Sequence, residues 1–358
     1  MATIQDVAQA AGVSVSTVSY VLSGSRPISA ATKARVQEAM EKLGYRPHPH
    51  ARALASKQSH LIALLIPPTR RGLGETEIDF ASHVSREALR AGYHTLLLTD
   101  EYDDLSSLQE FIHTSLVDGL ILMEVHTYDP RVQLLSTTKI PFVLIGRCET
   151  IEDTTLDKSA ERFSSEPSLN WVDIDFEGTL FTALEYYLEL GHRNAAFINQ
   201  SRAVYENGYG PVVRSFEALE RARRLYAFEK LEHYFCEAAN GAGYEITRHI
   251  VQQEPEIRAL IVMNDRALPG VYRALYEEKK RIPQDVSVLS MVSSERAAEM
   301  LYPPVTTLEF PAQVLASQAV QQLICQIEGN QGGPLHNTLR CPLVERGSTG
   351  RRADKDSY

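Results

Sequence analysis

The sequence contains few cysteines, and their arrangement supports neither a metal site nor a redox site. Of the 358 residues only four are cysteine, and no two of them form a C-x-x-C pair (Cys148, Cys236, Cys325 and Cys341). This spacing lacks the zinc-binding pattern, and a disulfide framework is not expected in a chain of this length. We therefore expect a protein of the reducing cytoplasm that binds no metal and needs no cofactor.

Long apolar runs, targeting segments and catalytic motifs are also missing. No stretch of about 18 apolar residues occurs, and "MATIQDVAQAAG" is not a basic start followed by an apolar run. The segments "GLGETE" and "NGAGYE" are incomplete phosphate loops, and no H-E-x-x-H or nucleophile elbow is present. We expect no membrane association and no enzymatic activity, so no residue is assigned a catalytic role.

Charge is unevenly distributed along the chain. The formal net charge is −10, yet residues 1 to 60 carry seven Lys and Arg against three Asp and Glu. The rest of the chain carries 29 basic and 43 acidic side chains. A small basic head on an acidic body is typical of a nucleic-acid-binding module attached to a larger unit.

The head is predicted to contain three short helices. Thr3 and Asp6 have the spacing of a capping box, and Gly12 ends the first helix. Ser14 and Ser29 are predicted to cap the second and third helices. Two helices joined by a tight turn at Gly12 form the helix-turn-helix arrangement that reads DNA.

The second helix, in "GVSVSTVSYVLSG", is rich in hydroxyl side chains, although Ser and Thr are mediocre helix formers. Short hydroxyl side chains bond phosphate oxygens and let a helix approach the duplex closely. The exposed face at the start of this helix, with Val15, Ser16 and Tyr20, is predicted to face the base edges.

From Leu61 onward, apolar strand-like runs alternate with helical segments in two consecutive series. "LIALLIPP", "HTLLLTD", "DGLILME" and "IPFVLIG" belong to the first series, and "WVDIDF", "NAAFINQ", "IRALIVMN" and "VSVLSMV" to the second. A loop over roughly 148–168 separates them. The pattern predicts a doubly wound α/β body of two lobes, with ligands bound between them beyond the carboxyl ends of the strands.

The head, "TIQDVAQAAGVSVSTVSYVLSGSRPISAATKARVQEAMEKLGYRPHPHARALAS", closely resembles that of the lac-repressor/galactose-repressor (LacI/GalR) family of transcription regulators. The body segments "IPFVLIGR", "LGHRNAAFI", "IPQDVSVLS", "PPVTTLEF" and "CPLVERGST" are similar to the same family. The resemblance implies an N-terminal helix-turn-helix head with a hinge helix, followed by a two-lobed body like that of periplasmic binding proteins.

The resemblance also implies domain boundaries. Residues 1–46 would form the DNA-binding head, 47–60 the hinge, 61–345 the effector-binding and dimerisation domain, and 346–358 a tail. Within the body, the first lobe is expected at 61–150 and 292–322. The second lobe is expected at 168–291 and 323–345.

Family positions extend the predicted DNA contacts. Tyr20 stands where many members have Arg, which predicts a changed base preference at one operator step. Leu54 stands where the family wedges a Leu into the minor groove, an established device for bending DNA. The expected phosphate contacts are Thr3, Ser14, Thr17, Ser19 and Ser23, the expected base contacts are Val15, Ser16 and Tyr20, and the expected hinge contacts are Ala51, Leu54 and Ala55.

Matching positions in the body nominate effector contacts: Asp79, Phe80, Arg147, Arg214, Asn264 and Asp265. Asp79 and Asp265 could instead cap helices, and Arg147 could form a surface ion pair. Val292 replaces a frequent ligand Asp of the family, while Tyr205, Tyr209 and Trp171 are additional candidates. These departures favour an uncharged, stacked ligand such as an oligosaccharide.

Together these features predict a repressor of sugar-utilisation genes. It would bind a palindromic operator as a homodimer and be released by a sugar-type effector bound between the lobes. The alternative is a DNA-binding regulator whose body only dimerises, or binds a non-sugar or co-repressor ligand. A transport protein for solutes would not need the basic head.

Overall fold

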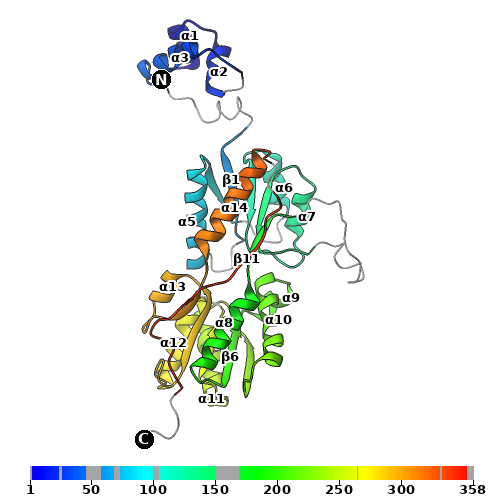
Figure 1. Cartoon of the computed structure of the whole chain (residues 1–358), viewed down its shortest axis with the longest axis vertical. Helices are drawn as coiled ribbons and strands as arrows, with labels where there is room; N and C mark the ends of the chain where they lie inside the picture. The colour runs from blue at the N-terminus through cyan, green and yellow to red at the C-terminus, as the bar shows by residue number, and fades with distance from the viewer. Residues whose placement is uncertain are drawn as a thin grey trace.

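The structure, a computed structural model, shows a three-helix head followed by a body of two α/β lobes (Figure 1). It describes residues 2–23, 26–45, 58–67, 73–99, 105–149, 169–263, 265–330 and 333–352. The predicted fold class is confirmed. Within the described ranges, no helix has both the length and the apolar character needed to span a membrane.

The head is built as the sequence pattern predicts. Its helices are α1 (Ile4–Ala11), α2 (Val15–Ser23) and α3 (Ala30–Lys42). Thr3 and Asp6 form the capping box, and Gly12 ends α1 in the left-handed conformation, with φ of 62°. The three helices enclose a small apolar core of Val7, Ala8, Ala11, Val18, Val36 and Ala39.

The first lobe is a parallel sheet covered by helices on both faces. Its six strands run in the order β11-β5-β4-β3-β1-β2. The strands are β1 (Leu61–Leu65), β2 (His94–Leu98), β3 (Gly119–Leu122), β4 (Phe142–Ile145), β5 (Trp171–Ile174) and β11 (His336–Leu339). The helices are α5 (Glu75–Arg90), α6 (Leu105–His113), α7 (Pro130–Ser136) and α14 (Ala312–Ile327).

The second lobe repeats this architecture, with strands in the order β12-β10-β9-β8-β6-β7 and only β12 antiparallel. The strands are β6 (Asn194–Asn199), β7 (Lys230–Phe235), β8 (Ala259–Val262), β9 (Ser287–Ser293), β10 (Thr306–Glu309) and β12 (Leu343–Val344). The helical segments are α8 (Phe176–Glu189), α9 (Arg202–Glu206), α10 (Gly210–Leu225), α11 (Asn240–Gln253), η2 (Asp265–Ala267), α12 (Leu268–Glu277) and α13 (Glu295–Glu299).

The lobe boundaries differ from those expected. Strand β5, placed in the second lobe by the sequence, pairs with β4 and β11 of the first sheet. Strand β10, placed in the first lobe, pairs with β9 of the second sheet. All of α14 packs on the first lobe, although its end and β11 fall in 323–345. The chain therefore crosses between the lobes after β5, after β10 and after β11.

The segment expected to be a tail is partly built into the second lobe. Ser348 is fully buried, and its hydroxyl donates to the carbonyl of Val288 at 2.6 Å and accepts from the amide of Thr306 at 2.7 Å. The amide of Arg352 donates to the carbonyl of Leu190 at 2.9 Å. Residues 346–352 thus belong to the lobe, because they satisfy backbone groups beside β9 and β10.

Helices α11 and α12 of the second lobe cross with their backbones almost in contact. A Cβ atom added at Gly270 would lie 1.8 Å from the carbonyl oxygen of Asn240. One added at Gly243 would lie 2.2 Å from the carbonyl oxygen of Ala267. Only glycine fits at these two positions, whereas Gly241 in the first turn of α11 faces open space.

Candidate DNA-reading surface and interlobe cavity

The start of α2 presents a compact polar surface to solvent. The Ser14 hydroxyl caps the helix by accepting from the Thr17 amide at 3.1 Å, and it lies 2.8 Å from the hydroxyls of Ser16 and Thr17. Ser14, Val15 and Ser16 are exposed, while Thr17, Ser19 and Tyr20 are half-buried beside them. The predicted base-reading residues therefore lie on an accessible face of the helix.

Tyr20 does not stand alone on this face. The guanidinium of Arg26, which follows α2, lies over the Tyr20 ring at 4.9 Å from its centroid. Such cation–π contacts hold a charged group in place next to an aromatic ring. The resemblance shows Tyr20 where many family members have Arg, and this contact brings the guanidinium of Arg26 next to that position. Arg26 was not among the residues predicted from the sequence.

Several of the expected DNA and effector contacts belong to segments outside the described residues. Ala51, Leu54, Ala55 and Asn264 lie outside the described residues. Thr3 is exposed at the first turn of α1, and Ser23 is the last residue of α2. The predicted DNA contacts therefore stay predictions.

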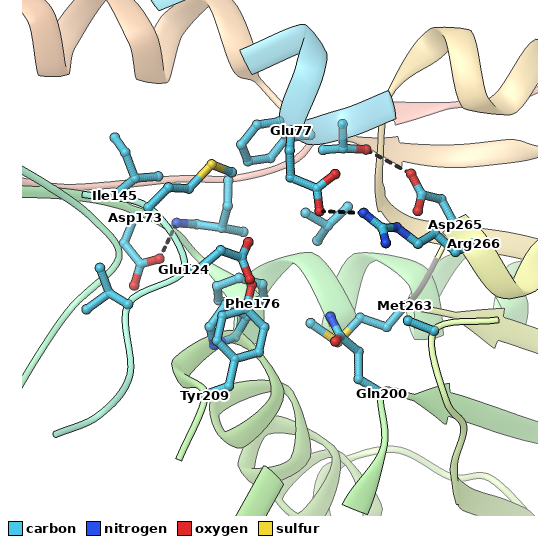
Figure 2. Close-up of a pocket in the computed structure, with 18 residues that line it drawn as sticks. Glu77, Glu124, Ile145, Asp173, Phe176, Gln200, Tyr209, Met263, Asp265 and Arg266 are labelled. Carbon is cyan, nitrogen blue, oxygen red and sulfur yellow. Dashed lines mark hydrogen bonds and ion pairs between the residues drawn. The ribbon is translucent and has the colours of Figure 1, made fainter. Parts of the chain in front are cut away.

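A cavity of about 120 Å³ lies between the two lobes. Its walls come from both lobes, at the carboxyl ends of the parallel strands, where the α/β pattern predicted a ligand site. Figure 2 shows its main side chains, which are Glu77, Glu124, Ile145 and Asp173 from the first lobe and Phe176, Gln200, Tyr209, Met263, Asp265 and Arg266 from the second.

Polar contacts join the lobes along one side of this cavity. The hydroxyl of Thr76 on α5 donates to Asp265 at 3.0 Å. Next to it, the Arg266 guanidinium lies 3.7 Å from the carboxylate of Glu77. These contacts link the first turn of α5 to η2 of the second lobe.

Backbone hydrogen bonds join the lobes elsewhere along the cavity. The amide of Thr127 donates to the carbonyl of Gly208 at 2.8 Å, and the amide of Gly210 donates to the carbonyl of Val125 at 3.2 Å. His126 and Tyr209 form an isolated antiparallel β-bridge between them. The lobes therefore meet through these backbone contacts as well as through the side chains of α5 and η2, and the cavity lies between them.

Glu124 is held in the cavity wall by a buried ion pair. Arg131 and Asp129 are almost fully buried and lie 2.7 Å apart, and Arg131 donates to the carbonyls of Met123 and Glu124 at 3.2 and 3.0 Å. This support fixes the backbone of Glu124 in the left-handed region, with φ of 58°. Strain of this kind at a non-glycine residue is concentrated at functional sites.

The side chain of Glu124 is in an electronegative environment. Burial raises the pKa of Glu124 to about 7, the charge of Glu77 acts in the same direction, and a hydrogen bond with Tyr209 opposes them. Burial and the charge of Glu77 also raise the pKa of Asp265, against a hydrogen bond from Thr76. Nearby Arg266 lowers both values without cancelling these effects.

The charge of Asp173, in the same wall, is balanced by two arginines. Asp173 is 3 % exposed and accepts from Arg147 at 3.1 Å and lies 3.0 Å from Arg214. Both arginines point into a separate lateral pocket beside Trp171, over whose ring Arg147 lies at 5.5 Å. Arg147 and Arg214 therefore lie outside the lining of the interlobe cavity, and the effector contacts predicted for them stay predictions.

Asp79 and Phe80 are also placed elsewhere. Asp79 lies 3.7 Å from His83 on the surface of α5, and Phe80 is fully buried against Phe310. Helix α5 begins at Glu75, so its first-turn residues Thr76 and Glu77 reach the cavity instead. Asp79 and Phe80 lie farther along the helix, away from the cavity wall.

Three other expectations fall at or near the cavity. Asp265 and Tyr209 line it, and so does Val292, which replaces the frequent ligand Asp of the resembled family. Tyr205 packs on Phe216 and does not contribute to the wall.

The sequence reasoning missed Glu77, Glu124 and Gln200. The last two could have been found, because Glu124 and Gln200 end the predicted strand segments "DGLILME" and "NAAFINQ", at the edge where ligands bind.

Comparison with known proteins gives one consistent picture. Residues 3–48 match the family model described as bacterial regulatory proteins, lacI family, and residues 184–349 match that of the periplasmic binding protein-like domain. The ribose operon repressor of Escherichia coli (strain K12) is 28 % identical over 358 residues, covering 97 % of this chain and 100 % of the relative. Such relatives are named as transcriptional regulators rather than enzymes.

Solved structures agree. A complex of the transcriptional regulator CelR with cellobiose is 25 % identical with a TM-score of 0.66, covering 97 % of this chain and 100 % of that one. The lac repressor dimer bound to operator and the anti-inducer ONPF is 22 % identical with a TM-score of 0.75, covering 98 % and 99 %. The second match shows a shared fold.

Proposed function

The chain belongs to the lacI family of bacterial regulatory proteins, and we therefore propose that it represses sugar-utilisation genes. It binds a palindromic operator as a homodimer in the cytoplasm and is released when a sugar-type small molecule occupies the interlobe cavity. The observation that carries this proposal is the cavity itself, lined by both lobes behind a separate DNA-reading head.

The head supports sequence-specific binding. Its second helix offers exposed small side chains at its start, and Tyr20 with Arg26 one turn later. In a helix-turn-helix protein, such residues reach base edges while neighbouring hydroxyls and helix-start amides bond phosphates. Residues 1–46 therefore act as the DNA-binding domain and 47–60 as the hinge, where Leu54 wedges between base pairs.

The body supports control by a ligand. Because the lobes touch through Thr76 and Asp265, and again through Thr127 and Gly208, a ligand in between changes their relative placement. A ligand shifts such an equilibrium only by its differential affinity for the two arrangements. An inducer binds better to the arrangement in which the two heads of the dimer no longer match the operator.

Dimerisation has a candidate surface on the second lobe. Three apolar side chains around one groove are highly exposed, namely Tyr276 at 83 %, Met300 at 70 % and Tyr302 at 93 %. Clustered exposure of this kind marks interaction surfaces in proteins that are otherwise well packed. A second copy of the chain that covers this groove would bring two heads onto one operator.

The proposal is tested by selecting operators from random DNA with the full-length protein, followed by competition with sugars. We expect a near-palindromic site and release by at least one sugar, seen as loss of the shifted band. Binding without sequence preference would overturn the regulatory assignment. Sequence-specific binding that no sugar weakens would leave the alternative in which the body only dimerises or binds another ligand.

A further inference from the structure

We propose that the effector is an amino sugar whose ammonium group binds beside Glu124. This inference rests on the proposed function, because it takes the interlobe cavity as the effector site. It adds the chemical class of the ligand, which the resemblance left open.

The charge of the cavity wall favours a cationic ligand. Glu77, Glu124 and Asp265 face the cavity, and Figure 2 shows their side chains around the same space. Arg266 lies among them, 3.7 Å from Glu77, while Asp173 is engaged by arginines of the lateral pocket. One guanidinium among three carboxyl groups leaves the wall short of positive charge.

The protonation of these carboxyl groups also favours a bound cation. Glu124 faces Glu77 on α5, Arg131 on α7, Tyr209 before α10, and Arg266 on η2, and the balance of burial and charge raises its pKa to about 7. The pKa of Asp265 is raised for the same reasons. A cation placed in the cavity would reverse this shift, since an opposite charge within about 4–6 Å favours the ionised carboxylate.

The remaining lining of the cavity suits a sugar ring rather than a bare cation. Phe176, Tyr209 and Phe310 supply aromatic surface, and Met123 and Met263 supply further apolar surface. The CH faces of a sugar pack on such walls, while its hydroxyls donate to carboxylates and to Gln200. A hexose bearing one amine combines both requirements.

This conclusion changes the expectation drawn from the sequence. Val292, which stands where the resembled family often has a ligand Asp, favoured an uncharged ligand. That expectation considered only the residues at positions where the family has ligands. Glu77 and Glu124 enter the wall from α5 and from just after β3, so the cavity wall carries acidic groups that residue 292 alone does not reveal.

The test is isothermal titration of the full-length protein at pH 6.5 with D-glucosamine, D-galactosamine and D-mannosamine. Each is compared with its parent hexose and with its N-acetyl derivative, which keeps the nitrogen and removes its charge. We expect at least one amine to bind tenfold or more tightly than both neutral analogues. Binding should also release more than about half a proton, seen as a difference in heat between phosphate and imidazole buffers, because Glu124 ionises.

Two variants complete the test. Glu124→Gln should weaken amine binding at least tenfold, the usual effect of losing a hydrogen bond to a charged group, and should abolish proton release. Its affinity for the neutral analogues should fall by a smaller factor than its affinity for the amine, because the amide oxygen still accepts a hydroxyl hydrogen bond while the charge is lost. Glu110→Gln, an exposed carboxyl on α6, should leave every affinity unchanged.

Specific outcomes overturn the inference. If a parent hexose or N-acetyl derivative binds as tightly as the amine, the effector is a neutral sugar, and the proposed function stands. An unchanged amine affinity in Glu124→Gln also overturns it. The absence of binding by all three amines also overturns it, and so does binding of Mg²⁺ or Ca²⁺ where no amine binds. Operator selection then tests the proposed function independently.

Discussion

Among single residues, Glu124 is a carboxyl group whose buried, acidic surroundings disfavour its charged form. Burial and the charge of Glu77 raise its pKa from the ordinary value of 4.5 to about 7. A raised carboxyl pKa means that the folded protein binds the proton more tightly than the unfolded chain does. The contribution of this group to stability is therefore greatest below pH 4.5 and is lost as the pH rises towards 7.

We predict that Glu124→Gln removes this pH dependence. Between pH 5 and pH 7.5 the wild type should lose about 2 kcal/mol relative to the variant, because the neutral amide needs no proton. Thermal unfolding of both proteins at the two pH values measures the difference, in which the titration of other groups cancels. Parallel changes in the two proteins would show that Glu124 ionises freely in the cavity.

Tyr20 should determine preference at a single symmetric operator position. Tyr20→Ala removes both the ring and the support it gives Arg26, so discrimination at that base pair should fall by about 1–3 kcal/mol. Binding to a set of operators with single base changes measures this. Gln37→Ala, exposed on α3, serves as the control and should not alter base preference. A uniform loss across all operators would instead indicate that Tyr20 contacts the DNA backbone.

At the level of elements, the crossing of α11 and α12 depends on two glycines. Gly270→Ala would place a methyl group 1.8 Å from the backbone of Asn240, which neither helix can accommodate without moving. We predict a loss of more than about 3 kcal/mol and a lowering of the unfolding midpoint by roughly 6 °C or more.

The matched control for this crossing is Gly241→Ala on the same helix α11, where the added methyl group meets open space. Because Ala is the better helix former, the variant should be as stable as the wild type, or more stable by up to about 1 kcal/mol. Similar midpoints for the two variants would contradict close contact between the helices. Scanning calorimetry of the full chain distinguishes these results.

The hinge gives a prediction for a segment outside the described residues. Leu54→Ala should weaken operator binding far more than non-specific binding, because a wedge acts only where the central base step can open. Titrations with operator DNA and with random DNA of equal length provide the comparison. Equal losses on both would show that residue 54 acts as a general DNA contact.

Individual helices and strands were more predictable from the sequence than the neighbours with which they pair. Local sequence patterns predict β1, which is a short apolar run, and the start of α1, where a capping box forms. The assignment of β5 and β10 to the wrong lobes has a different origin, because a strand's neighbours are set by pairing between distant segments. Glu77 was missed for a similar reason, since the exact start of α5 decides which residues face the cavity.

On the scale of the whole molecule, charge and dimerisation act together. The head carries the excess of basic side chains and the rest of the chain the excess of acidic ones, so the body is repelled by DNA that the head attracts. A single head has few phosphate contacts available, and two linked heads gain through effective concentration. We infer that strong operator binding is a property of the dimer.

A fragment of residues 1–46 tests this inference, because the head has its own apolar core. We predict that the fragment binds operator at least about 100-fold more weakly than the full-length protein under the same salt conditions. Fluorescence anisotropy with labelled operator measures both affinities. Comparable affinities would show that one head suffices and that the body adds nothing to operator binding.

The placement of β11 and β12 has a consequence for synthesis in the cell. Each sheet takes an edge strand from residues 336–344, so neither lobe has its full set of strands until the ribosome has synthesised this segment. The head emerges hundreds of residues earlier. A transcript cut short before codon 336 would therefore yield a polypeptide that can touch DNA but has no complete sensor to release it.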